Sequence, residues 1–257
     1  MIDIAPEPAL AFVDRGDGQR IAIRHRPASA GQPAILFLPG YASDMAGQKA
    51  VAIDHYCAAR GLGCIRLDYS GTGHSEGDFA AGTLARWLAD ALAVVDRVVH
   101  AGPLVVMGSS MGGWIALHVA LRRPERVAAI LGIAAAPDFT HWGYSPEEKA
   151  VLLRDGWLGR PNAYGPEPSI MHRPFWQSGE ALRLLDAAID LALPVRLIHG
   201  DQDTEVPLSI ALKLIEQLRS ADVQLRLIKG GGHRLSDPHE IHAILVELAG
   251  LVELIDR

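Results

Sequence analysis

The sequence has little cysteine, no long apolar run and no excess of basic residues. Its 257 residues include only two cysteines, Cys57 and Cys64, which argues against a disulfide framework and favours a reducing compartment. No apolar run approaches the ~20 residues that a membrane-spanning helix needs. The net charge of -6 gives no electrostatic reason to expect nucleic acid or an anionic membrane as a partner. The histidines show no zinc-ligand spacing, so we expect neither a metal nor an organic cofactor.

The N-terminal residues also lack the marks of a targeting segment. They are acidic and contain proline, without the basic start and apolar run of a signal peptide or the arginines of a transit peptide. Together with the cysteine content, this predicts a soluble, cytoplasmic protein. Apolar residues, by contrast, are abundant at 49%, which is ample for the core of one large domain.

Short apolar strands alternate with helical patterns along most of the chain. We expect strands at about residues 11–13, 21–25, 34–38, 64–67, 104–106, 127–133, 194–199 and 223–228, the first two forming a hairpin. The helical pattern of residues 83–99 is strongly amphipathic, with Thr83 as its N-cap and Asp90 off its apolar face. Because most strands are apolar throughout, the sequence predicts an α/β fold whose central sheet is mostly parallel and covered by helices on both faces.

Between residues 138 and 190 the alternation stops, and the chain becomes rich in proline, glycine and aromatic residues. We interpret this segment as a small cap, inserted over the carboxyl edge of a core formed by residues 1–137 and 191–257. Its three tryptophans are candidate substrate-binding residues that could line an apolar acyl pocket, although bulky side chains could equally hold down a short insertion. These residues are Trp142, Trp157 and Trp176.

Four basic residues of the same segment could hold an anionic leaving group, but a solvated surface is the favoured interpretation. They are Arg154, Arg160, His172 and Arg173.

Residues 108–113 (GSSMGG) join an apolar strand directly to a helical pattern. This order is typical of a nucleophile elbow, where the serine of G-x-S-x-G occupies a sharp strand-to-helix turn. The flanking Gly108 and Gly112 carry no Cβ that would obstruct the turn. Ser110 is therefore the predicted nucleophile, and the preceding Ser109 is expected to pack.

The same five-residue pattern occurs again at residues 73–77, around Ser75. In this copy the serine lies several residues past its strand, and no helix follows it directly. The bare pattern arises easily by chance in a glycine-rich chain, so its context favours Ser110 over Ser75.

A serine nucleophile needs a base that a carboxylate orients. His233 follows a predicted strand within a glycine-rich loop, and Asp203 follows an earlier one, in the chain order Ser, Asp, His. Asp203 is favoured as the acid over Asp201 and Glu205, which are expected to be solvated loop charges. The neighbouring His199 is expected to anchor the loop.

An oxyanion hole requires two backbone N–H groups that point at the developing negative charge. The amide after the nucleophile belongs to Met111, and a second amide is expected from Tyr41, in the loop after strand 34–38.

Several stretches together resemble the α/β-hydrolase superfamily. Within it, the chain is similar to the alpha/beta-hydrolase domain-containing protein 10 family, which comprises mitochondrial palmitoyl-protein thioesterases and acyl-glucuronide esterases. The stretches that carry this resemblance are LPGY, CIRLDYSGTGHSEG, GSSMGGWIALHVA, HGDQDTEVP and GGGHR. The resemblance places Ser110, Asp203 and His233 on the catalytic positions and implies hydrolysis of thioesters and carboxylic esters. Without a transit peptide the mitochondrial address is not expected to carry over, and the alanine- and arginine-rich composition favours a bacterial relative.

The leading hypothesis is thus a serine esterase or thioesterase that forms an acyl-enzyme on a small-molecule substrate or an S-acylated protein. Carbon–carbon bond hydrolysis or lyase chemistry could use the same triad, because fold alone does not fix function. A non-catalytic binding protein is less consistent, because it would be expected to lack a member of the triad. A serine at the elbow also disfavours enzymes that use an aspartate nucleophile.

Overall fold

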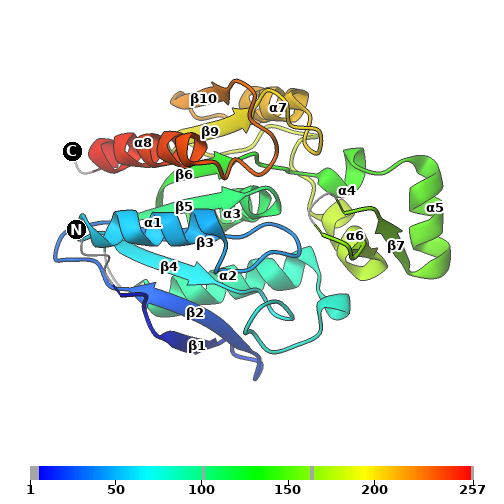
Figure 1. The fold of residues 1–257 in the computed structure, drawn as a ribbon, viewed down its shortest axis with the longest axis horizontal. Coiled ribbons are helices and arrows are strands. Elements are labelled where there is room, and N and C mark those ends of the chain that lie inside the picture. The colour runs from blue at the N-terminus through cyan, green and yellow to red at the C-terminus, as the bar shows by residue number, and fades with distance from the viewer. Residues whose placement is uncertain (1–5, 100–101, 163–164, 256–257) are drawn as a thin grey trace.

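The computed structural model describes residues 6–99, 102–162 and 165–255. Their centre is an eight-stranded sheet in the order β1-β2-β4-β3-β5-β6-β9-β10 (Figure 1). The strands are β1 (Leu10–Asp14), β2 (Arg20–Arg26), β3 (Ala34–Leu38), β4 (Gly63–Leu67), β5 (Leu104–Ser109), β6 (Val127–Ile133), β9 (Val195–Gly200) and β10 (Val223–Ile228). From β4 to β10 neighbouring strands are parallel, whereas β1 and β2 form the predicted antiparallel hairpin.

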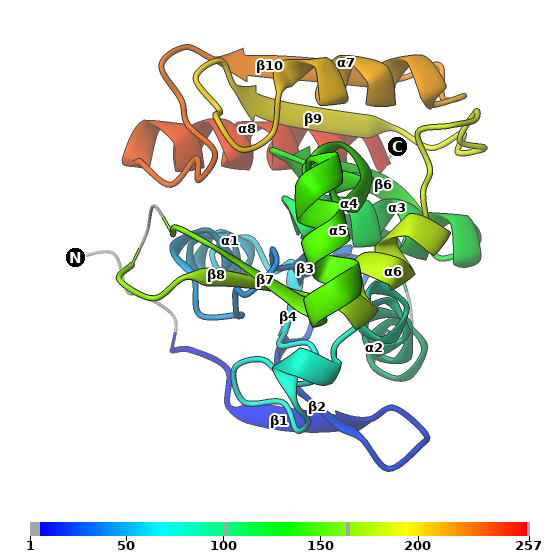
Figure 2. The same cartoon turned by 90° about the vertical axis from the view of Figure 1, so that its right-hand side faces the viewer.

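Helices cover both faces of this sheet, as the apolar strands predict. Figure 2 shows α1 and α8 on one side of the sheet and α2, α3 and α7 on the other. These helices are α1 (Gln48–Ala58), α2 (Leu84–Val98), α3 (Met111–Arg122), α7 (Leu208–Gln217) and α8 (Pro238–Ile255). Successive residues of a strand point to opposite faces, so Ile35 packs in the core under α1 and α8 while Leu36 packs under α2 and α3. The fold is therefore the expected α/β sandwich.

Helix ends follow the signals in the sequence. The N-cap side chain of α2 is Thr83, whose Oγ1 accepts the N–H of Arg86 at 3.0 Å. At the start of α8, the Asp237 N–H donates to Oε2 of Glu240 at 2.8 Å, which is one half of a capping box. Among the described residues, none of the helices has the length and apolar character needed to cross a bilayer.

One residue of α2 departs from the expectation. Asp90 is fully buried rather than outside the packed face. Its carboxylate accepts hydrogen bonds from Arg15 Nη1 at 2.9 Å and from the Ser70 N–H at 2.8 Å. These partners come from two distant loops, so helical periodicity alone could not reveal them.

Between β6 and β9 the chain leaves the sheet and forms a protruding segment, seen at the right of Figure 1. It contains α4 (Phe139–Trp142), α5 (Pro146–Asp155), β7 (Trp157–Arg160), β8 (Ser169–His172) and α6 (Arg173–Ala181). The sequence predicts no sheet here, but β7 and β8 pair antiparallel. A short helix η1 (Phe79–Ala81) precedes α2 on the core side. That residues 138–190 act as a cap stays a prediction.

Candidate active site

The turn between β5 and α3 has the geometry of a nucleophile elbow. Ser110 adopts φ 55° and ψ -119°, a conformation rare for a residue with a side chain. A Cβ on Gly108 would lie 2.1 Å from the Gly112 carbonyl oxygen, and one on Gly112 would lie 2.1 Å from that of Leu38. Both positions therefore require glycine. Ser109 is buried, as predicted.

Ser110, His233 and Asp203 lie in one hydrogen-bonded row. His233 Nε2 is 3.1 Å from Ser110 Oγ, and His233 Nδ1 is 2.9 Å from Asp203 Oδ2. A carboxylate only accepts, so the Nδ1–H donates to Asp203 and leaves Nε2 to accept the Ser110 hydroxyl proton. The three residues follow β5, β9 and β10, whose carboxyl ends meet at one edge of the parallel sheet. We call this row the serine relay.

Asp203 is held as a carboxylate by its surroundings. Its side chain is 1% exposed, and its Oδ1 accepts the backbone N–H groups of Glu205 and Val206, both at 2.9 Å. Burial alone would raise the pKa of Asp203, but the hydrogen bond and charge of His233, together with the two amides, lower it below its usual value. The buried His199 donates through Nε2 to the Val206 carbonyl at 2.9 Å, and thus anchors this loop as predicted.

The second G-x-S-x-G copy has a different environment. Ser75 Oγ donates to the Asp68 carbonyl at 2.6 Å and accepts the Ala22 N–H at 2.7 Å. Both contacts are with backbone groups, and they fasten the loop after β4 to β2. Ser75 is accordingly a structural residue of this loop.

The loop after β3 lies against the elbow. A Cβ on Gly40 would be 3.5 Å from the Ser110 Cβ, so the backbone before Tyr41 passes close to the serine. The Tyr41 hydroxyl donates to the Ile170 carbonyl of β8 at 2.8 Å, and burial raises the pKa of this phenol. Use of the Tyr41 and Met111 amides as an oxyanion hole stays a prediction.

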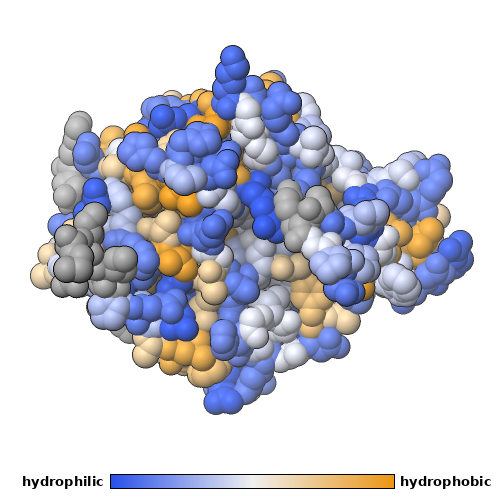
Figure 3. All heavy atoms as spheres, viewed as in Figure 1, coloured by the Kyte–Doolittle hydropathy of each residue, from blue (hydrophilic) through white to orange (hydrophobic). Residues whose placement is uncertain are grey.

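The three candidate tryptophans occupy different environments. Trp142 Nε1 donates to the Pro137 carbonyl at 2.8 Å, and the buried Trp176 donates to the Thr140 carbonyl at 3.0 Å. Trp157 is 53% exposed on β7, and Figure 3 shows apolar and polar side chains mixed over the protruding segment. Trp142 and Trp176 thus help to hold the segment together. Contact of any of the three tryptophans with a substrate stays a prediction.

The four candidate basic residues of this segment all contact other parts of the protein, His172 through the Phe79 ring at 6.0 Å between centroids. Arg160 pairs with Glu148 and lies over the Tyr144 ring at 4.1 Å from its centroid, whereas Arg154 pairs with Asp155. Arg173 donates to the Leu153 carbonyl at 3.0 Å.

Two loop carboxylates are exposed, as expected, but each also approaches the loop after β10. Asp201 Oδ1 accepts the Gly230 N–H at 2.6 Å and so joins the loop after β9 to the loop after β10. Glu205 Oε2 lies 3.9 Å from His233 Nε2. Sequence spacing could not distinguish these contacts from solvation, because both depend on how the two loops meet.

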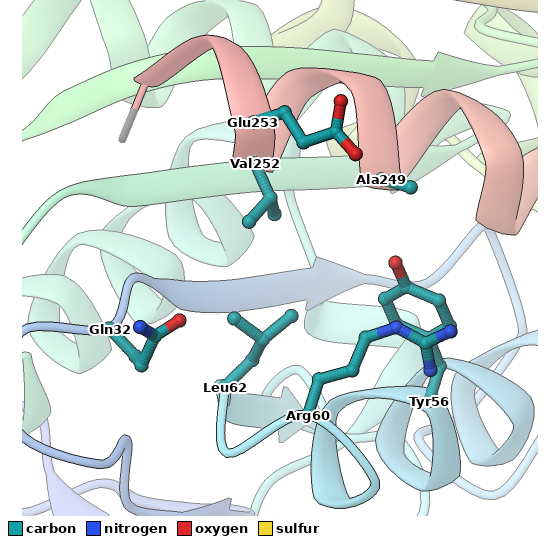
Figure 4. A pocket seen from close by; sticks show the side chains of 7 residues that line it. All are labelled: Gln32, Tyr56, Arg60, Leu62, Ala249, Val252 and Glu253. Carbon is teal, nitrogen blue, oxygen red and sulfur yellow. The ribbon is translucent and has the colours of Figure 1, made fainter. Parts of the chain in front are cut away.

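One cavity of about 320 Å³ lies on another part of the molecule, between α1 and α8 (Figure 4). Its lining includes Tyr56, Val252 and Glu253, and the Arg60 guanidinium stacks 3.8 Å from the Tyr56 ring centroid. None of the serine relay residues lines this cavity, so we do not assign it a part in their chemistry.

The fold and the elbow define an α/β-hydrolase. A hydrolase family model described as serine aminopeptidase, S33 matches residues 30–159. The mouse palmitoyl-protein thioesterase ABHD10 is 36% identical, over 95% of this chain and 83% of the relative. The chain therefore belongs to the ABHD10 family of α/β-hydrolases and is a hydrolase.

Solved structures agree with this assignment. A protein of Agrobacterium vitis described as a hydrolase has a TM-score of 0.89 and 38% identity, covering 96% of this chain and 99% of that one. The structure of mouse alpha/beta-hydrolase domain-containing protein 10 has a TM-score of 0.88 and 35% identity, covering 95% and 98%. The resemblance inferred from the sequence motifs is thereby confirmed.

The comparisons correct one prediction. Relatives from mouse and human are named as mitochondrial proteins, which contradicts the cytoplasmic location predicted from the sequence. That prediction rested on the residue types at the N-terminus and on the scarcity of cysteine. Scarce cysteine indicates a reducing environment without specifying which compartment supplies it.

Proposed function

We propose that the protein is a serine hydrolase that cleaves carboxylic thioesters and esters through an acyl-enzyme on Ser110. The observation that carries this proposal is the serine relay, in which Ser110 Oγ, His233 and Asp203 are joined by contacts of 3.1 and 2.9 Å. Such a row supplies a nucleophile, a base and the carboxylate that orients the base.

In the proposed mechanism, Ser110 Oγ attacks the acyl carbon while His233 Nε2 takes its proton. The bond between the acyl carbon and the leaving sulfur or oxygen breaks, and Nε2–H returns the proton to that leaving atom. Water then attacks the acyl-enzyme by the same route and releases the acid. Asp203 stabilises the imidazolium that forms in both steps, which its lowered pKa supports because it remains ionised.

The negative charge on the acyl oxygen needs donors beside the nucleophile. We assign this role to the backbone N–H groups of Tyr41 and Met111. The support is that Met111 begins α3 directly after the serine, and that Gly40 lies close to the Ser110 side chain. The positive end of a helix also favours negative charge at this point.

The substrate class is proposed from the relatives and the surroundings of the relay. The relatives are named palmitoyl-protein thioesterases, which supports an acyl thioester, free or on a protein. Aromatic rings packed between the core and the protruding segment support an apolar acyl group. Tyr41 lies 4.8 Å from Phe175 and 6.1 Å from Phe139, between ring centroids.

A chain-length series tests this function. Thioesters of N-acetylcysteamine and p-nitrophenyl esters, from acetyl to palmitoyl, would be assayed with the wild type, Ser110→Ala and Ser75→Ala. We expect turnover by the wild type, a loss of kcat/KM of ~10⁴-fold or more in Ser110→Ala, and retention of activity in Ser75→Ala.

The same series shows how the proposal would fail. Full activity in Ser110→Ala together with loss in Ser75→Ala would overturn the choice of nucleophile. If the wild type turned over no ester or thioester but still bound one tightly, a binding protein on a hydrolase scaffold would be the better description.

A further inference from the structure

We propose that Glu205 is a specificity-determining residue that favours cationic and neutral leaving groups over anionic ones. The inference rests on the proposed hydrolysis through Ser110 and His233, and adds to it the chemistry of the leaving side of the substrate.

The position of Glu205 is fixed by its backbone. It lies in the loop between β9 and α7, where its N–H donates to Asp203 Oδ1 at 2.9 Å. Its side chain then brings Oε2 to 3.9 Å from His233 Nε2, the nitrogen that is itself 3.1 Å from Ser110 Oγ. The Glu205 side chain is 44% exposed, so it is in contact with solvent as well as close to the base.

The reaction brings the leaving group to this carboxylate. As the bond from Ser110 Oγ to the acyl carbon forms, the bond to the leaving sulfur breaks, and Nε2–H gives that sulfur the serine proton. The sulfur must therefore reach hydrogen-bond distance of Nε2. Whatever the sulfur carries comes close to Glu205 at that moment, because Glu205 lies beside the same nitrogen.

Two cations lie at the start of the loop that follows His233 and on the neighbouring helix α1. Lys49 of α1 donates a hydrogen bond from Nζ to the Arg234 carbonyl, one residue after His233. Burial, and then the Arg234 charge, lower the pKa of Lys49 to about 8, so these two cations lie close to each other. Glu205 approaches His233 from the β9–α7 loop, with its Oε2 on the Nε2 side of the ring, whereas Asp203 contacts Nδ1.

The effect is electrostatic and screened. A unit charge on the leaving group ~6 Å from a half-exposed carboxylate would change rates by about threefold to tenfold in each direction, less at high salt. The geometry therefore predicts a preference among leaving groups rather than an absolute selection.

The test uses three thioesters that share the acyl group cleaved best in the chain-length series. Their thiols are thiocholine, N-acetylcysteamine and 3-mercaptopropionate, which are cationic, neutral and anionic near the sulfur. Release of thiol gives kcat/KM for each, normalised to its rate of hydroxide-catalysed hydrolysis. In the wild type we expect the thiocholine ester to exceed the mercaptopropionate ester by about tenfold or more, a ratio that falls with added salt.

Two variants and one control complete the test. Glu205→Gln keeps the backbone donor and should bring the ratio close to one, while Glu205→Lys should invert it. Glu216→Gln makes the same change of net charge on an exposed position of α7, and should leave the ratio as in the wild type.

An equal ratio in the wild type, Glu205→Gln and Glu205→Lys would overturn the inference while leaving the hydrolase intact. A salt-independent ratio in the wild type would overturn it as well, and would not require either variant to fold. Failure of the wild type to cleave any of the three thioesters would contradict the proposed function, and the inference would fall with it.

Discussion

Ser110 occupies a backbone conformation that costs roughly 1–3 kcal/mol for a residue with a side chain. Three backbone hydrogen bonds hold Ser110 in this conformation. Its N–H donates to the Ile133 carbonyl at 2.9 Å, and its carbonyl accepts the N–H groups of Gly113 and Ala136. These contacts come from β6, from the loop after β6 and from α3, so the chain on both sides of the turn holds the serine in this conformation.

Asp203 offers the sharpest prediction at this scale. Asp203→Asn keeps the shape of the side chain but places an amide where His233 Nδ1–H now donates, which disfavours the tautomer that can accept the serine proton. We expect kcat to fall by ~10³–10⁴-fold with a much smaller change in KM, measured by steady-state kinetics.

Asp201→Asn is the matched control, because this residue is the alternative acid from the same loop and its Oδ1 accepts the Gly230 N–H outside the relay. Its kcat should remain within about tenfold of the wild type. If Asp201→Asn rather than Asp203→Asn caused the larger loss, the assignment of the acid would be wrong.

At the scale of elements, the strands and most helix ends could be predicted from the sequence. Residues 34–38 and 127–133 are apolar throughout, and they form β3 and β6 with those bounds because both faces of the sheet are covered. The β7–β8 pair could not be predicted. Its strands are four residues long, and their pairing depends on the fold of the segment around them.

Substitution of Gly112 tests how tightly the elbow is packed. Gly112→Ala would place a Cβ 2.1 Å from the Leu38 carbonyl oxygen, where only a shift of α3 or β3 could make room. We expect a loss of stability of several kcal/mol, about 3 or more, or failure to fold. Thermal and urea unfolding would measure it.

Gly250→Ala serves as the comparison within α8. A Cβ at this helical position meets nothing within 4 Å, so alanine should stabilise the fold by about 0.5–1 kcal/mol. If Gly112→Ala left the free energy of unfolding unchanged, Gly112 would not lie as close to the Leu38 carbonyl as the structure shows.

His118 of α3 links the core to the protruding segment in its neutral form. Nε2 donates to the Leu182 carbonyl at 2.9 Å, and Nδ1 accepts from Arg122 Nη1 at 2.9 Å, so the ring has no place for a second proton. Burial lowers its pKa to about 4, from the ordinary histidine value of 6.5.

This shift predicts a pH-dependent loss of stability. Between pH 6.5 and 4 the unfolded chain binds a proton at His118 that the folded chain does not, so the free energy of unfolding falls as the pH falls through this window. The contribution is about 3 kcal/mol over the full window. Urea unfolding of the wild type and His118→Gln at pH 7 and pH 4.5 would measure it as the difference between their pH responses. An identical pH response in the two proteins would contradict the assignment.

At the scale of the whole molecule, one sheet edge gathers residues that are far apart in the sequence. Ser110, Asp203 and His233 each follow a parallel strand, and the carboxyl ends of parallel strands share an edge, so their meeting could be predicted. The approach of Glu205 to His233 could not, because it depends on the conformation of two loops. The cellular location was also beyond reach, since the residues used to infer it do not determine it.

The protruding segment is fastened to the core by hydrogen bonds. It contacts the loop after β3 through the Tyr41 hydroxyl and the Ile170 carbonyl. Asp138 joins the beginning of the segment to its end, because its carboxylate accepts the N–H groups of Leu184 and Leu185, each at 2.8 Å. Hydrogen bonds thus hold the segment both to the core and across its own base.

The most direct test of the central claim is to trap the acyl-enzyme. The protein would be mixed with a p-nitrophenyl ester, quenched in acid and digested, and the mass of each serine-containing peptide determined by tandem mass spectrometry. The account predicts the acyl mass on Ser110 in the wild type and in Ser75→Ala, and its absence from Ser110→Ala. An acyl group found on another residue, with Ser110 unmodified and Ser110→Ala fully active, would contradict it.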